Sequence, residues 1–117
     1  MTGILSYAQG LAGEAQVEAA YAARGSRIVA RRWRGSCGEV DLVIQDGACL
    51  VFVEVKTSRS IGRALKSLRP AQINRITATA AEFLDTRPAG QLTETRFDVA
   101  AVTTMGQVEI VENALSV

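Results

Sequence analysis

The chain has 117 residues, of which 48% are hydrophobic and 21% are charged, and its net charge is +1. These values are typical of one globular domain that can bury a core without disulfide or zinc support, so we expect a single domain over residues 1–117. No apolar run approaches the roughly 20 residues that a membrane-spanning helix needs. The N-terminus lacks the pattern of a secretory signal, so we expect a cytoplasmic location.

The chain has no histidine, which excludes serine–histidine and cysteine–histidine catalysis within one chain. Its two cysteines, Cys37 and Cys49, form no CxxC pattern, and this argues against a structural zinc site. We expect both cysteines to be reduced thiols that are buried or half-buried.

The first half of the chain predicts one helix and three strands. An alanine-rich pattern from about Ser6 to Arg24 favours a helix, and Gly25 has the place of its C-terminal cap. Residues 27–33, with the sequence RIVARRW, predict a strand. A break at residues 35–38 then precedes a hairpin, whose predicted two-residue turn is Asp46-Gly47.

The second half of the chain predicts a helix and two more strands. A polar loop and a short helical turn over residues 63–68 precede Pro70, which suits the first position of a helix. Strands are predicted at residues 95–102 and 107–111. The order helix, three strands, helix, two strands predicts an α/β domain with a mixed central β-sheet flanked by helices. The apolar stripe of the second helix is formed by Ile73, Ile76, Ala80 and Phe83 or Leu84.

The hairpin separates charged from apolar side chains, because the side chains of a strand alternate between its two faces. With Asp46-Gly47 as the turn, Gln45 pairs with Ala48, and Asp41 faces Phe52. One face then carries Val40, Leu42, Ile44, Val51, Val53 and Val55. The other face carries Glu39, Asp41, Glu54 and Lys56, with Val43, Leu50 and Phe52 nearer the turn.

The charged residues on this face suit metal-assisted phosphodiester hydrolysis. Asp41 and Glu54 are expected on a cross-strand diagonal, with Cα atoms ~7–8 Å apart. Glu39 opposite Glu54 would repel it, and a cation such as Mg²⁺, which takes carboxylate, water and phosphate oxygens, would remove that repulsion. Lys56 points to the same side and could hold an attacking water or stabilise charge on a phosphate. The alternative is an exposed cluster of ion pairs with a purely structural role.

Basic residues gather before and after the hairpin. They are Arg24, Arg27, Arg31, Arg32 and Arg34 before it, and Arg59, Arg63, Lys66, Arg69 and Arg75 after it. These residues are either two solvated faces or two flanks that contact phosphates around the acidic centre.

The hairpin also resembles a known signature. Asp41 followed by Glu54-Val55-Lys56 resembles the D…(D/E)xK signature of the PD-(D/E)xK nuclease superfamily. A longer set of motifs is similar to the bacterial YraN-like family of small uncharacterised proteins, from about Gly10 to Val102. This set comprises Gly13-Glu14, Gly25, Trp33-Arg34, GEVDLV, LVFVEVKTSRS, the helix that starts at Pro70, and RFDVAAV.

The resemblance implies a fold like that of restriction endonucleases and Holliday-junction resolvases, with Mg²⁺ or Mn²⁺ as cofactor. In that fold a helix glutamate, a strand aspartate and the ExK pair build the metal site, and here Glu14, Asp41, Glu54 and Lys56 match them. Glu18, one turn after Glu14, is a rival for the first position. Glu39 belongs to the GE-x-D motif and is a further candidate ligand.

Two other positions matter for the resemblance. Gln72 stands where the family often has a lysine, a departure that bears on DNA cleavage rather than on the fold. Asp98 matches a family-typical residue that could orient Lys56 or an arginine, or cap the edge of the core.

We therefore expect a metal-dependent endonuclease that hydrolyses DNA, with branched or damaged DNA as candidate substrates and Asp41, Glu54 and Lys56 as catalytic residues. A catalytically inactive nucleic-acid-binding module of the same fold is the first alternative, and an interaction domain is the second. By analogy with junction resolvases, a homodimer is expected. The expected nucleic-acid contacts are Arg31, Arg32, Arg34, Arg59, Arg63, Lys66 and Gln72.

Overall fold

A computed structural model describes the backbone of residues 2–115 and the side chains of residues 12–115. Helices and strands follow one another in the predicted order, and the short helical turn expected after the third strand is present as a helix. The elements are α1 (Thr2–Ala23), β1 (Arg27–Arg34), β2 (Glu39–Asp46), β3 (Cys49–Ser58), α2 (Ile61–Lys66), α3 (Pro70–Leu84), the 3₁₀ helix η1 (Gly90–Leu92), β4 (Thr95–Thr103) and β5 (Val108–Val111).

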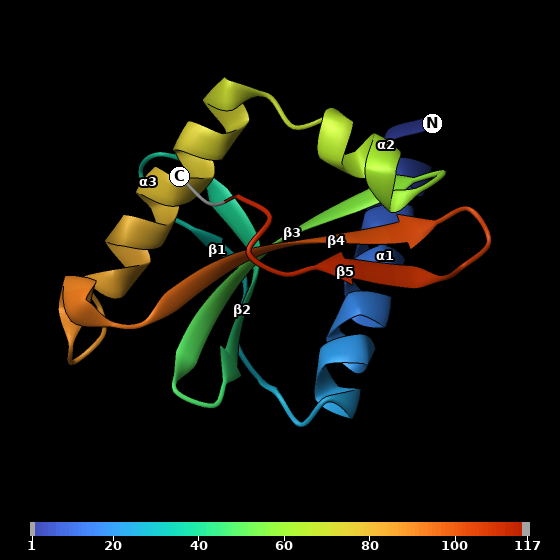
Figure 1. Ribbon diagram of the computed structural model, residues 1–117. Helices are drawn as coiled ribbons and strands as arrows, with labels where there is room; N and C mark the ends of the chain where they lie inside the picture. The colour runs from blue at the N-terminus through green and yellow to red at the C-terminus, as the bar shows by residue number, and fades with distance from the viewer. Residues whose placement is uncertain (1, 116–117) are drawn as a thin grey trace.

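The strands form one mixed sheet in the order β1-β2-β3-β4-β5. Only β3 and β4 are parallel, and the chain between them crosses over through α2 and α3. These two helices lie on one side of the sheet and α1 lies on the other (Figure 1). The predicted α/β class and mixed sheet are therefore confirmed. Within residues 2–115, no helix is long and apolar enough to cross a membrane.

Strand alternation divides the core into two layers, one on each side of the sheet. The layer under α1 contains Val17, Tyr21, Leu42, Ile44, Val51 and Val53. The layer under α3 contains Val43, Leu50, Phe52, Ile76, Ala80 and Phe83. The apolar stripe predicted for the second helix is thus buried against the sheet, and the ring of Phe83 meets Trp33 and Phe52 edge to face.

The predicted C-terminal cap of α1 and the predicted first residue of α3 are present, whereas α1 begins at Thr2 and not near Ser6. Gly25 has φ +86°, a left-handed conformation that glycine adopts without strain, and its amide donates to the carbonyl of Ala22. Pro70 begins α3, where its missing N–H costs no intrahelical hydrogen bond.

The predicted turn of the hairpin is wrong by one residue. Asp46 pairs with Cys49, so Gly47 and Ala48 form the turn, and Gly47 has the positive φ of +58°. Val43 therefore pairs with Phe52, where Asp41 was expected. Glycine fits the first central position of a type II′ turn as well as the second position of a type I′ turn, so the dipeptide alone does not choose.

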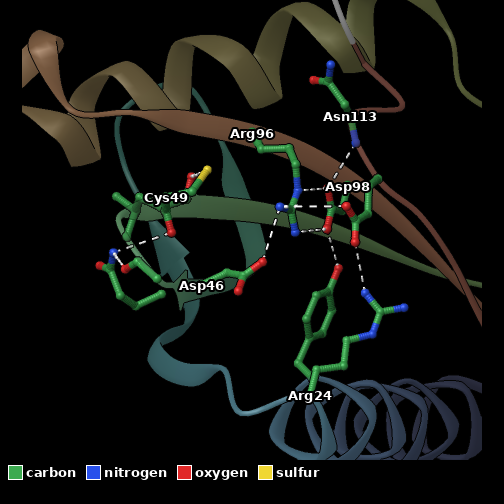
Figure 2. Close-up of polar contacts among 11 residues, drawn as sticks. Arg24, Asp46, Cys49, Arg96, Asp98 and Asn113 are labelled. Atoms are coloured by element: carbon green, nitrogen blue, oxygen red, sulfur yellow. Dashed lines mark hydrogen bonds and ion pairs between the residues drawn. The ribbon is translucent and has the colours of Figure 1, made fainter.

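A buried polar network ties α1, β4 and the C-terminal segment together. Asp98 is fully buried, and its carboxylate accepts hydrogen bonds from Tyr21 Oη at 2.7 Å and from Nε and Nη2 of Arg96 at 2.8 and 3.1 Å. It also accepts the backbone N–H of Asn113, while Arg96 reaches outward to Asp46 at 3.2 Å (Figure 2). Burial and the hydrogen bond to Asp98 raise the pKa of Tyr21, so this phenol stays a donor.

We expect Asp98→Ala to lower the free energy of unfolding by about 3–5 kcal/mol, because it strands the Arg96 cation without its buried partner. Asp46→Ala is the matched control, since its carboxylate contacts the same arginine at the surface, and its cost should stay below about 1 kcal/mol. Urea unfolding of both variants measures the difference. Equal losses would show that burial of the carboxylate is not what matters.

Candidate active site

Regular strand pairing lapses at Asp41 on both sides. The ladder between β2 and β3 ends at Leu42 and Val53. The ladder between β1 and β2 joins Arg31 to Leu42 and Trp33 to Val40, and it skips the position between them. Strand β2 is therefore irregular at Asp41, close to the point where it parts from β3.

Because of this irregularity in β2, one residue lies on a different face from the one predicted. Val40 was expected on the face of Leu42 and Ile44, but it packs in the layer under α3. Residues 40 and 42 thus lie on opposite faces, because the strand rotates between them. The carboxylate of Asp41 accepts the backbone N–H of Val55 at 2.8 Å, and so bridges the two strands where their ladder has ended.

Asp41 and Glu54 lie against each other. Burial, a hydrogen bond with the Glu54 carboxylate and the charge of Glu54 raise the pKa of Asp41 to about 8, against the opposing effect of the Val55 amide. Glu54 is itself buried, with 9% of its surface exposed. A charged carboxylate beside Asp41 disfavours its ionisation unless a cation joins the two groups. Asp41 therefore keeps its proton at neutral pH, or a metal ion takes the place of that proton.

Glu54 is held from two further directions. Gln72 on α3 donates through Nε2 to Oε2 of Glu54 at 2.7 Å. Lys56 Nζ lies 4.0 Å from the same oxygen. Neither contact uses Oε1 of Glu54. Gln72, expected as a nucleic-acid contact, is thus a direct partner of the acidic pair, and its place in the first turn of α3 puts the start of that helix beside the site.

Two more acids border the pair, and each is already matched by an arginine. Burial raises the pKa of Glu14 and the charge of Asp41 raises it further, while its bidentate hydrogen bonds to Arg32 oppose the shift. Glu39 accepts from Arg34 at 3.0 Å. In the part of the chain whose side chains are described, no three acidic or thiol groups converge as a ready-made metal cluster.

The rival helix acid lies in a different ion pair. Glu18 is joined to Arg31 by two hydrogen bonds of 2.8 and 2.9 Å. Asp41 acts on the pKa of Glu14, so of the two helix acids Glu14 is the one shown to be within electrostatic reach of the pair. Of the roles predicted for Asp98, the structure shows contact with an arginine, since its carboxylate binds Arg96 on β4 and Tyr21 on α1.

The predicted basic contacts fall into two groups. Arg31, Arg32 and Arg34 on β1 are each paired with an acid. The second group is exposed, and its members make no ion pair with any residue whose side chain is described. It consists of Arg59, Arg63, Lys66, Arg69 and Arg75, around α2 and the first half of α3. The second group, rather than the first, offers cations to an outside anion.

A pocket of about 440 Å³ lies next to the site, but the acidic residues of the site do not line it. It lies between α1 and the ends of β3 and β4. Gly13 and Thr57, the chain neighbours of Glu14 and Lys56, line it, but none of the four acids does.

The raised pKa of Asp41 predicts a pH-dependent stability. Below its unfolded pKa of 3.8 the group is protonated in both states, and between 3.8 and about 8 only the folded state keeps the proton. The folded protein therefore loses stability as pH rises through this window. Asp41→Asn removes that loss, so its free energy of unfolding should exceed the wild-type value by at least about 1.4 kcal/mol more at pH 8.5 than at pH 5.

Urea unfolding at the two pH values measures this difference in the absence of divalent cations. Asp85→Asn, a change of the same kind at an exposed position, controls for net charge. A constant difference between Asp41→Asn and the wild type would contradict the raised pKa of Asp41.

Comparison with known proteins agrees with the motifs. The profile of the uncharacterised protein family UPF0102 matches residues 13–102. A UPF0102 protein of Ruegeria pomeroyi is 52% identical over 112 residues, which cover 96% of this chain and 91% of the relative. A UPF0102 protein of Cereibacter sphaeroides is 47% identical over 116 residues, which cover 99% of both chains. The resemblance to the YraN-like family is therefore confirmed, and the chain belongs to the UPF0102 family.

Proposed function

We propose that this protein is a metal-dependent endonuclease that hydrolyses phosphodiester bonds of DNA. The observation that carries the proposal is the contact between Asp41 and Glu54, with Lys56 beside it, where β2 parts from β3. The same residues match the D…(D/E)xK signature, which supports a resolvase-like nuclease fold. Branched or damaged DNA is the proposed substrate, the cytoplasm the proposed location, and a homodimer would supply two sites for paired cuts.

The residues of the site fit Mg²⁺ or Mn²⁺. These ions often take only one or two carboxylates from the protein and complete their shell with water and phosphate oxygens. Asp41 and Glu54 would hold the ion, since the proton that Asp41 keeps marks a place where positive charge is needed. When bound, such an ion lowers the pKa of a water and polarises a phosphoryl oxygen.

The remaining residues orient this pair and its surroundings. The Val55 amide fixes one oxygen of Asp41, and Gln72 fixes one oxygen of Glu54. Lys56, beside Glu54 Oε2, can stabilise negative charge that develops on a phosphate, or hold a water by hydrogen bond. The exposed cations of α2 and α3 would contact the DNA backbone.

Purified protein with Mg²⁺ or Mn²⁺ should cleave labelled duplex, flap or four-way-junction DNA. Asp41→Asn and Lys56→Ala should each lower the rate at least about 100-fold, because each removes a group that acts only in the transition state or on the ion. Asp85→Asn is the control and should keep the wild-type rate. Cleavage that survives Asp41→Asn would come from a contaminant and would contradict the proposal.

A non-catalytic nucleic-acid-binding module is the second candidate. It is favoured by the exposed cations around α2 and α3, and by Gln72, which already occupies Glu54 and stands where the family often has a lysine. On this alternative the protein binds DNA but does not cleave it, whichever metal ion is added.

Both candidates share a prediction about salt. Replacing Arg63 or Arg69 by alanine should weaken DNA binding and lower the slope of log affinity against log salt by about 1 for each phosphate that the variant no longer neutralises. Arg27→Ala is the control, because Arg27 pairs with Gln45 toward the hairpin turn, beyond the acidic pair. Fluorescence anisotropy at several salt concentrations measures the slopes. If neither variant changes the slope of log affinity against log salt, the DNA binds elsewhere on the protein.

A further inference from the structure

Two neighbouring arginines of β1 make nearly identical ion pairs with the same helix. Arg31 binds Glu18, and Arg32 binds Glu14, each through two hydrogen bonds of 2.8 or 2.9 Å. The pairs differ in their surroundings. The side chains of Arg31 and Glu18 are 65% and 21% exposed, whereas those of Arg32 and Glu14 are 33% and 13% exposed.

Both pairs can form only because the strand is distorted. Successive residues of a regular strand point to opposite faces, so Arg31 and Arg32 should not reach one helix together. Arg32 does so with φ +48°, a left-handed conformation that is strained for a residue with a side chain. It lies opposite Asp41, at the position that the β1–β2 ladder skips. The distortion and the acidic pair therefore occur at the same place.

The Arg32 guanidinium occupies both oxygens of the acid that borders Asp41. Glu14 lies within reach of the charges of Asp41 and Glu39, so without a cation it would add to their repulsion. Arg32 neutralises it by a bidentate contact, which is the strongest geometry for this pair of groups. The same contact engages both oxygens of Glu14 and holds its carboxylate in one orientation.

We propose that Arg32 is a positioning residue that withholds Glu14 from the cation site. A divalent cation at Asp41 and Glu54 gains Glu14 as a third carboxylate only when Arg32 lets it go. The inference rests on the proposed metal site, and it adds that this site has a weak state with two carboxylates and a strong state with three. Arg31 and Glu18 serve as the comparison, because their pair has the same geometry and is more exposed.

Calorimetric titration with Mn²⁺ alone, without nucleic acid, tests the inference. Arg32→Gln should bind Mn²⁺ roughly 5-fold or more tightly than the wild type, because Glu14 becomes available. Arg31→Gln removes the same charge from the neighbouring residue and is the matched control, with an affinity within about 2-fold of the wild type. Circular dichroism and thermal unfolding check that each variant is folded.

Glu14→Gln completes a double-mutant cycle. In the wild-type background it should change Mn²⁺ affinity by less than about 2-fold, since Glu14 is already occupied, whereas in the Arg32→Gln background it should abolish the gain. Arg32→Lys, which keeps the charge but not the bidentate contact, gives an intermediate gain and serves if Arg32→Gln does not fold.

Several results would overturn the inference. Unchanged or weaker binding by Arg32→Gln would mean that Arg32 does not withhold Glu14. An equal gain in Arg31→Gln, or a gain that survives Glu14→Gln, would show a general effect of charge. Absence of Mn²⁺ binding in both the wild type and Arg32→Gln would remove the proposed metal site as well. If the variants show the expected Mn²⁺ affinities but the protein does not cleave DNA, the nuclease proposal is wrong and this inference still holds.

Discussion

The separation of β2 from β3 after Leu42 and Val53 is the constraint on which the site depends. A continuous ladder would use the Val55 amide for backbone pairing, and Asp41 could not accept it. Because the ladder stops, the carboxylate of Asp41 takes the place of a backbone acceptor and lies against Glu54. The distortion of β1 at Arg32 falls at the same level, so the irregularity crosses three neighbouring strands. Irregular pairing of this kind is common beside functional sites, where it re-aims a side chain.

The charges of the site are balanced without a metal ion. Glu14 and Glu39 each have an arginine, Glu54 has Gln72 and Lys56, and Asp41 keeps a proton. Only the last of these arrangements is costly, since it depends on a buried carboxyl group whose ionisation the surroundings oppose. The chain can thus fold without a bound cation. Ionisation of Asp41 is unfavourable in that state, and a cation at the pair would make it favourable.

Much of the fold follows from local signals, and the site follows only in part. Periodicity and end signals such as Gly25 and Pro70 give the elements, because each depends on a few adjacent residues. The hairpin register escaped prediction because a shift of two residues keeps every side chain on its face, so the apolar pattern cannot detect it. The partners of Gln72 and Arg32 escaped because each contact joins residues 18 apart in the sequence, and no periodic pattern records such distances.

The buried carboxylate of Asp98 has a consequence for the position of Glu14. It binds Tyr21 near the beginning of the chain and the amide of Asn113 near its end, and it lies on the strand that completes the parallel pair with β3. Glu14 lies two turns before Tyr21 on α1, so the docking of that helix governs where this acid rests. Loss of any of these contacts would leave a polar group buried without a partner, so α1 stays on the sheet together with the segment after β5. The position of Glu14 beside the acidic pair therefore depends in part on a carboxylate of β4 that is not itself part of the site.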